Sequence, residues 1–176
     1  MIGIIIVGVV VLVIFICVFI FYNNKFKFAI IKLDKAEEDI NMYLNKKYEL
    51  LDRTRPIIKK ELKLEDFMVN LDNYDSESSN IDNHNLLKGC YNELFKVLDD
   101  YEKLLKSKTL VKILDELNDN EEDVIGSIKF YNDTVVTFNE LVATFPSSMV
   151  ALLCRYKRLE FYSNEKREIF EILNTK

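Results

Sequence analysis

The sequence predicts an all-α protein in which an N-terminal transmembrane helix continues into an antiparallel bundle of three to four long helices. Three observations predict this class, of which the first two are that an uncharged apolar segment opens the chain and that apolar residues then recur at three- and four-residue steps. A third is the scarcity of turn formers, since the 176 residues include only four glycines and two prolines. Sandwiches, barrels and Rossmann folds need more of both residues in their turns and phosphate loops.

The first element is the apolar segment 2–22, which contains no charged side chain. As a helix, its 21 residues span about 31 Å, the thickness of a bilayer's hydrocarbon core. A secretory signal peptide is the alternative, but it requires a basic leading region, a shorter apolar stretch and a small-residue cleavage site. We therefore expect residues 1–22 to be a retained anchor through which the chain binds the membrane.

The basic juxtamembrane segment 23–35 indicates the topology. Positive charge marks the cytoplasmic side of a span, and no lysine or arginine precedes this one. We expect a single-pass protein of the cell membrane with its N-terminus outside and its C-terminal domain in the cytoplasm. Phe21, Tyr22, Phe26 and Phe28 are candidate interfacial anchors, although the last two also fit a continuing amphipathic helix. The topology signal consists of Lys25, Lys27, Lys32 and Lys35.

Residues 36–162 are expected to form the helical bundle. An apolar stripe runs from Ala36 to Leu62, interrupted by Lys47 and Thr54. Pro56 removes a backbone N–H, so we expect a kink or break near Thr54, with the helical pattern resuming to about residue 71.

The polar segment 72–85 is predicted to be a flexible loop, followed by a second helix over about 85–105. Short links favour an antiparallel bundle over the alternative, a long parallel coiled coil. Ser107 is a candidate cap for a third helix of about 38 residues, whose stripe extends to Phe145.

The third helix should end at Phe145-Pro146, because the residue before a proline avoids helical angles. Ser147 or Ser148 is then a candidate cap for a short fourth helix that reaches about Cys154. Residues 163–176 remain as a C-terminal tail.

Several function classes are disfavoured. The net charge of −5 argues against nucleic-acid binding, and three widely spaced cysteines imply neither a disulfide framework nor a zinc site. His84 is the only histidine, and the acidic stretch 115–123 lacks the glycine and ligand order of a calcium loop. No phosphate loop, nucleophile elbow or paired Glu-x-x-His motif is present. We expect no enzyme activity, no catalytic residue, no cofactor and no metal.

The stretch 131–148 is the candidate interaction motif, because an aromatic-asparagine pair occurs there twice, seven residues apart. The aromatic side chains fall on the buried stripe of the third helix, and Asn132 and Asn139 flank it. These asparagines are expected to bond within the bundle or face water; the alternative is a polar ladder read by a partner. The motif comprises Tyr131, Asn132, Phe138, Asn139, Phe145, Pro146 and Ser147.

Residues 131–162 resemble the C-terminal signature of the LemA family of bacterial membrane proteins. The signature includes the two aromatic-asparagine pairs, the Phe-Pro-Ser turn, an alanine and later aromatic residues. Segment 36–51 and the pair Tyr22-Asn23 resemble the family as well. Departures include Phe138 in place of a tyrosine and Arg155 in place of a glycine, which puts the following turn in doubt. The signature positions after the turn are Ala151, Tyr156, Phe161 and Tyr162.

The resemblance implies a membrane anchor, a cytoplasmic helical bundle and no established enzyme activity. We expect a helical interaction or scaffold module that binds an unknown protein partner or itself, and no nucleic acid. The alternative is a membrane-shaping or lipid-associated protein, suggested by the lysines after the span and by a basic cluster. If the first and third helices ran in the same direction, that cluster would lie far from lipid. Its members are Arg155, Lys157 and Arg158.

Overall fold

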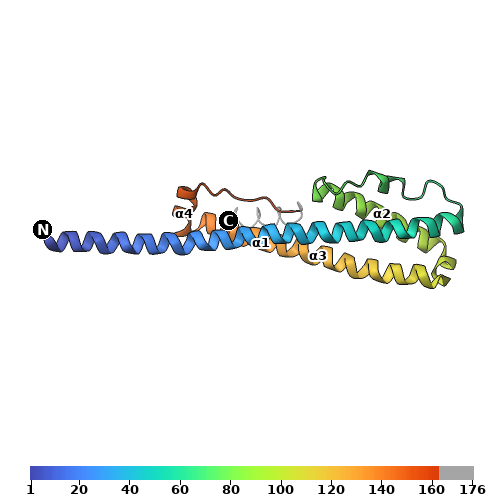
Figure 1. Ribbon diagram of the computed structural model, residues 1–176, viewed down its shortest axis with the longest axis horizontal. Helices are drawn as coiled ribbons and strands as arrows, with labels where there is room; N and C mark the ends of the chain where they lie inside the picture. The colour runs from blue at the N-terminus through green and yellow to red at the C-terminus, as the bar shows by residue number, and fades with distance from the viewer. Residues whose placement is uncertain (163–176) are drawn as a thin grey trace, which may run out of the picture. The chain divides into compact units, whose positions relative to one another are not determined.

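The computed structural model describes residues 1–162 (Figure 1), and within them every regular element is a helix. The predicted all-α class is confirmed. The predicted tail, residues 163–176, lies outside the described residues. The elements are α1 (Ile2–Leu62), the 3-10 helix η1 (Val69–Asn73), α2 (Asn80–Asp100), the 3-10 helix η2 (Glu102–Lys106), α3 (Lys108–Ala143) and α4 (Ser147–Cys154).

Helix α1 contains 61 residues and, among the described residues, is the one helix that is by itself long and apolar enough to cross a membrane; α3 and α4 meet that test only when the bent pair is counted as one span. None of the most apolar 18-residue stretch of α1 is buried inside the molecule. Large aliphatic side chains therefore point outward on all sides, as lipid contact requires.

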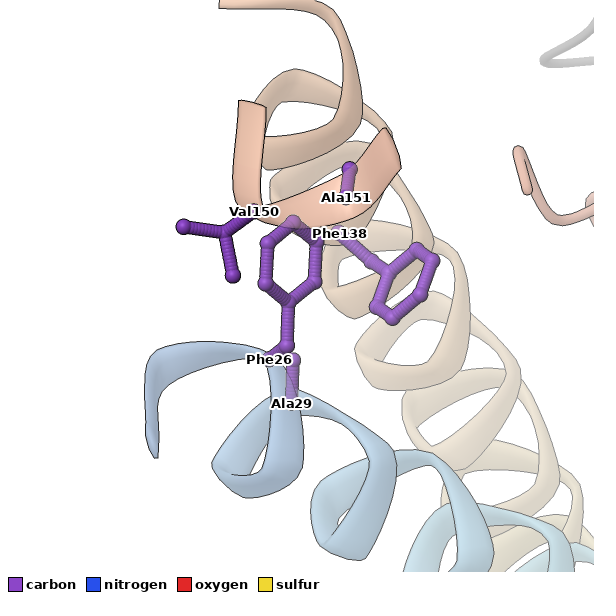
Figure 2. Close-up of a cluster of buried hydrophobic side chains, with 5 residues drawn as sticks. All are labelled: Phe26, Ala29, Phe138, Val150 and Ala151. Carbon is purple, nitrogen blue, oxygen red and sulfur yellow. The ribbon is translucent and has the colours of Figure 1, made fainter. Parts of the chain in front are cut away.

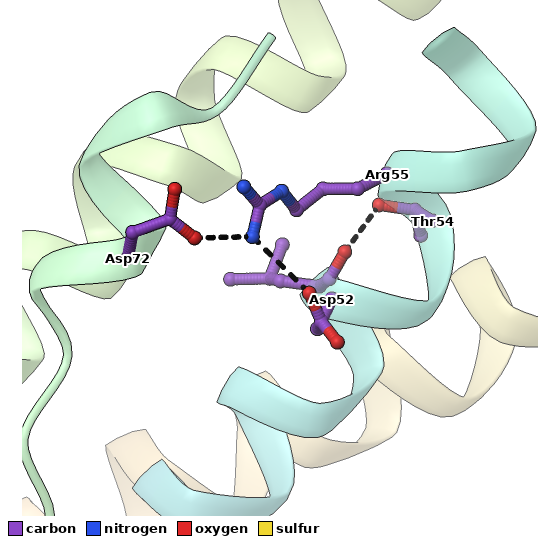
Figure 3. Close-up of polar contacts among 5 residues, drawn as sticks. Asp52, Thr54, Arg55 and Asp72 are labelled. Carbon is purple, nitrogen blue, oxygen red and sulfur yellow. Dashed lines mark hydrogen bonds and ion pairs between the residues drawn. The ribbon is translucent and has the colours of Figure 1, made fainter. Parts of the chain in front are cut away.

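Of the kink or break predicted near Thr54, the break is wrong, because α1 continues through Pro56 to Leu62. Proline removes only one helical hydrogen bond, while Thr54 and Ile58 on either side of it are fully buried. The Thr54 hydroxyl is satisfied inside the helix, donating to the Leu51 carbonyl at 2.7 Å (Figure 3). Packing of one continuous face thus holds the helix together across the proline.

The helix ends nine residues earlier than the predicted position 71. Lys63 adopts a left-handed conformation with φ 54°, which stops helical hydrogen bonding. Arg55 then ties η1 to α1: its guanidinium donates to Asp52 at 3.2 Å and to Asp72 at 2.7 Å (Figure 3). The hydrogen bond from Arg55 holds the pKa of the Asp72 carboxyl below its ordinary value.

The chain divides into two compact units, each described separately below. The anchor unit comprises Met1–Lys35 and the chain from Phe130 onward, and the central unit comprises Ala36–Lys129.

In the central unit, α1 and α3 run antiparallel. Arg53 pairs with Glu116, and Lys47 pairs with Glu121, so rising numbers on α1 meet falling numbers on α3. Lys47 is fully buried, and its Nζ also lies 4.9 Å from the centre of the Tyr91 ring. The lysine that interrupts the apolar stripe is therefore tolerated because a carboxylate and an aromatic face partner its charge.

Helix α2 begins five residues before its predicted start, so residues 80–85 of the predicted loop are helical. The side chain of Ser79 caps it by accepting a hydrogen bond from the Ile81 amide. The helix also ends earlier, at Asp100, which leaves the expected core residues Tyr101 and Leu105 about half exposed. Periodicity alone did not show these boundaries.

Helix α3 begins as predicted. Ser107 precedes it and accepts a hydrogen bond from the Leu110 amide through its hydroxyl. The acidic stretch 115–123 is helical throughout. After α3, Ser147 is the first residue of α4 rather than its cap. Its hydroxyl donates back to the Thr144 carbonyl.

Candidate functional site

The signature residues gather in the anchor unit, around a hydrophobic cluster that joins α1, α3 and α4 (Figure 2). Phe26 stands at its centre with no exposed surface. Its ring meets that of Phe138 edge-on, with centroids 5.4 Å apart. Phe26 is therefore a core residue rather than an interfacial anchor, whereas Phe28 is 60% exposed. The buried members are Phe26, Ala29, Phe138, Val150 and Ala151.

After α4 the chain returns along α3 as a segment without regular structure, residues 156–162, here called the return segment. Asn139 grips it at two atoms: its amide nitrogen donates to the Leu159 carbonyl at 2.9 Å, and its oxygen accepts from the Leu159 amide at 2.8 Å. Asn132 accepts a hydrogen bond from the Tyr162 amide at 2.8 Å. Two side chains of α3 thus form hydrogen bonds with the backbone of the return segment, in place of the neighbouring strand that would do so in a sheet.

The seven-residue spacing of the asparagines matches the return segment. Seven helical residues advance about 10.5 Å and return to nearly the same face. Three extended residues advance about 10 Å, which is the step from Leu159 to Tyr162. Because Asn139 holds Leu159 and Asn132 holds Tyr162, the segment runs antiparallel to α3.

Both asparagines are nearly fully buried, with exposures of 3% and 4%. The sequence places them beside the stripe, but the return segment covers them and makes them part of the interior. Their oxygen atoms, and the donating amide of Asn139, are engaged with the chain's own backbone. This geometry satisfies buried polar groups and fixes the return segment on α3.

Aromatic rings flank this clamp. Tyr156 stacks on Phe26 with centroids 4.6 Å apart, and its hydroxyl lies 3.4 Å from the side-chain oxygen of Asn23. Tyr162 meets Tyr131 edge-on at 6.1 Å. Burial raises the pKa of both the Tyr156 and Tyr162 phenols above the ordinary value, so both stay protonated at neutral pH.

The turn after α4 forms without the glycine that the signature leads one to expect. Arg155 occupies the left-handed region at φ 59° and ψ 31°. Its amide donates to the Leu152 carbonyl, and the Tyr156 amide donates to the Ala151 carbonyl at 2.9 Å. These bonds complete a Schellman ending, with a side chain at the position that usually carries glycine.

The remaining members of the predicted motif have different surroundings. Tyr131 is half-buried and Ser147 is buried. Phe145 was expected on the buried stripe but is 80% exposed, because α3 ends at Ala143 and the stripe does not continue beyond it. The four lysines after the apolar segment are all exposed.

Sequence reasoning did not identify the partners of the asparagines. Leu159 and Tyr162 contribute backbone groups, for which no residue type gives a signal. The one available signal was the seven-residue spacing.

A second feature belongs to the central unit: a groove between α2, η2 and α3. Phe95, Leu98, Val111 and Leu114 supply apolar lining, and half-exposed Leu105 lies among them. The lining also includes three exposed carboxylates, which are Asp99, Glu102 and Asp115.

Catalytic features are sparse in the part of the chain that the structure describes. It holds no group of three His, Cys, Asp or Glu side chains that could bind a metal ion. Its cysteines, at positions 17, 90 and 154, are free thiols. His84 is partly buried in α2, where burial and then the charge of Lys47 lower its pKa below 6.5.

Comparison with known proteins gives one family match. The model of the LemA family matches residues 36–172, a range that begins after the apolar segment and includes the central unit, α4 and the return segment. No curated protein matches the chain.

Proposed function

The chain belongs to the LemA family, and from that premise we propose that it is a membrane-anchored helical module that works by binding a protein partner. The groove of the central unit carries this proposal, because it is a concave, partly apolar surface between α2, η2 and α3. LemA is not a known enzyme family, and catalysis forms no part of the proposed role.

The lining of the groove indicates the kind of partner. Phe95, Leu98 and Val111 give the groove an apolar lining, which suits the apolar face of a helix. Asp99, Glu102 and Asp115 favour positive charge beside that face. The occupant proposed is therefore an amphipathic helix of another protein that carries lysine or arginine next to its apolar side.

The buried asparagines support this choice over the ladder hypothesis. A partner that read Asn132 and Asn139 would first have to displace the return segment and break three hydrogen bonds. The groove requires no such rearrangement.

The proposed orientation places the N-terminus outside the cell membrane and the rest of the chain in the cytoplasm, on the strength of the lysines after the span. An impermeant maleimide applied to intact cells tests it at an introduced Ser76→Cys, since Ser76 is exposed. Labelling without permeabilisation contradicts a cytoplasmic location.

The groove is tested with a photo-crosslinking amino acid at Leu105 of the full-length, membrane-inserted chain, with mapping of the captured peptide. We expect that peptide to come from a basic amphipathic helix. Asp99→Lys should abolish the crosslink. Asp119→Lys, a charge reversal at an exposed acid outside the groove, should leave it intact.

Capture of an acidic or non-helical peptide contradicts the proposal, as does equal capture by the Asp99→Lys chain. A probe at Met42, an exposed apolar residue of α1, controls for nonspecific capture. A crosslink that forms equally at Met42 and Leu105 also contradicts the groove as the binding site.

A further inference from the structure

Helix α4 has two apolar sides, and only one of them is packed. Val150 and Ala151 are buried members of the hydrophobic cluster, with exposures of 3% and 2% (Figure 2). The other side is open to the surroundings, although it is just as apolar. It consists of Met149 (45% exposed), Leu152 (80%) and Leu153 (61%), together with Phe145 (80%) just before the helix, and is here called the outer face of α4.

The outer face lies level with the end of the apolar segment of α1. Phe19 and Tyr22, the last apolar turn of that segment, pack against the same cluster as Val150. The Sγ atom of Cys154 lies 3.8 Å from the side-chain oxygen of Asn23, the first polar residue after the segment. If residues 2–22 cross a bilayer, α4 is therefore held at the boundary between hydrocarbon and headgroups.

The direction of α4 fits that boundary. The end of α3 runs alongside α1 in the anchor unit (Figure 1), and α4 turns away from α3 by 93°. A helix that lies across a membrane-spanning helix lies close to the membrane plane. Interfacial amphipathic helices take this orientation, with the apolar side among the acyl chains.

Positive charges follow both apolar elements in the sequence. Arg155, Lys157 and Arg158 come directly after α4, and Lys25 and Lys27 come shortly after the apolar segment. All five side chains belong to exposed residues. Such residues beside a span attract the anionic headgroups of the cytoplasmic leaflet.

We propose that α4 is an interfacial membrane helix whose outer face enters the leaflet from which α1 emerges, while Arg155, Lys157 and Arg158 contact anionic phospholipid headgroups. The anchor unit then holds the bilayer at two points, a transmembrane helix and a helix in the membrane plane. The basic cluster would lie far from lipid if the first and third helices ran in the same direction. In the anchor unit α3 instead leads back toward the apolar segment and brings the basic cluster to it. The inference does not depend on the groove, which lies in the central unit.

The chain contains no tryptophan, so a single introduced tryptophan reports one position. The full-length Leu152→Trp variant is reconstituted into vesicles of phosphatidylcholine and phosphatidylglycerol, with and without bromine on the acyl chains. We expect blue-shifted emission, strong quenching by brominated lipid and weak quenching by acrylamide.

Phe130→Trp is the matched control, because Phe130 is an exposed aromatic residue of the anchor unit about 20 Å along α3 from Ala143, where the helix ends. Its tryptophan should be quenched by acrylamide and not by brominated lipid. Phe145→Trp is a second, conservative variant at an 80% exposed position, and it should behave like Leu152→Trp.

Three outcomes overturn the proposal. Water-like emission from both Leu152→Trp and Phe145→Trp means that the outer face is outside the bilayer. Blue-shifted emission that brominated lipid does not quench means that protein covers the face, through a second copy or another partner. Equal lipid quenching in vesicles of phosphatidylcholine alone removes the role of anionic headgroups, whereas weaker quenching there supports it.

Discussion

The two-point grip of Asn139 on Leu159 makes a quantitative prediction about local stability. Asn139→Ala removes both the donor and the acceptor that hold the Leu159 backbone. A net contribution of about 1 kcal/mol per hydrogen bond gives an upper value of about 2 kcal/mol. Leu159 is 36% exposed, so water can reach its freed backbone groups, and we expect about 1–2 kcal/mol.

The assay is amide hydrogen exchange of the full-length chain in a mild detergent. The Leu159 amide exchanges when the return segment opens, so a loss of about 1–2 kcal/mol should accelerate its exchange roughly 5- to 30-fold. Asn132→Ala removes one bond, to Tyr162, and should accelerate exchange of that amide about 5-fold. Asn24→Ala, an exposed asparagine of the same unit, should change neither rate.

Unchanged exchange at Leu159 in Asn139→Ala would refute the clamp, because it would mean that the hydrogen bonds do not hold the segment closed. Equal acceleration along all of α3 would refute it as well. That result would show that Asn139 supports the packing of the helix rather than the return segment.

Three further predictions concern stability, each measured as the free energy of unfolding of the full-length chain. Arg155→Gly should stabilise by about 0.5–1 kcal/mol, since φ 59° strains any residue with a Cβ, and Arg155→Ala, which removes the charge but keeps the Cβ, should not. Glu121→Ala should destabilise by about 2–3 kcal/mol because it leaves the buried Lys47 ammonium without its carboxylate. Lys47→Met should be milder, since Glu121 is 22% exposed and can be hydrated. Burial holds the pKa of His84 below its ordinary value in the folded chain, so the unfolded chain binds the proton first. Stability should therefore fall as the pH drops through about 6.5, and His84→Gln should remove that part of the slope.

Much of the fold follows from local periodicity. The stripe from Ala36 to Ile58 is buried as predicted, because each of these residues lies on one helical face regardless of what covers it. The capping position of Ser107 and the end of α4 at Cys154 also follow from short-range chemistry. Such features depend on neighbours in the sequence, which is why the sequence reveals them.

The errors arose where distant packing decided the outcome. A proline predicts a break, but burial on both sides of Pro56 keeps α1 continuous. The predicted apolar stripe extends to Phe145, but α3 ends before it, at Ala143. No local pattern shows that the Phe145 ring is exposed. The start of α2 was missed for a local reason instead: Ser79 provides a cap within a stretch whose composition is typical of loops.

The candidate site was only half predictable. The asparagine repeat is visible in the sequence, and so is its spacing. The group that Asn132 binds is the backbone amide of Tyr162, 30 residues away, and any residue except proline supplies such an amide. The resemblance to the LemA family is confirmed by the family match, but it did not indicate what the repeat binds.

The match between seven helical residues and three extended ones makes this part of the chain sensitive to length. One residue inserted between Asn132 and Asn139 would rotate one of them by about 100° around α3 and move it about 1.5 Å along the axis. One residue deleted between Leu159 and Tyr162 would reverse the direction of the amide at one contact. Substitutions can adjust the strength of the clamp, whereas insertions and deletions inside either interval remove one of its two points.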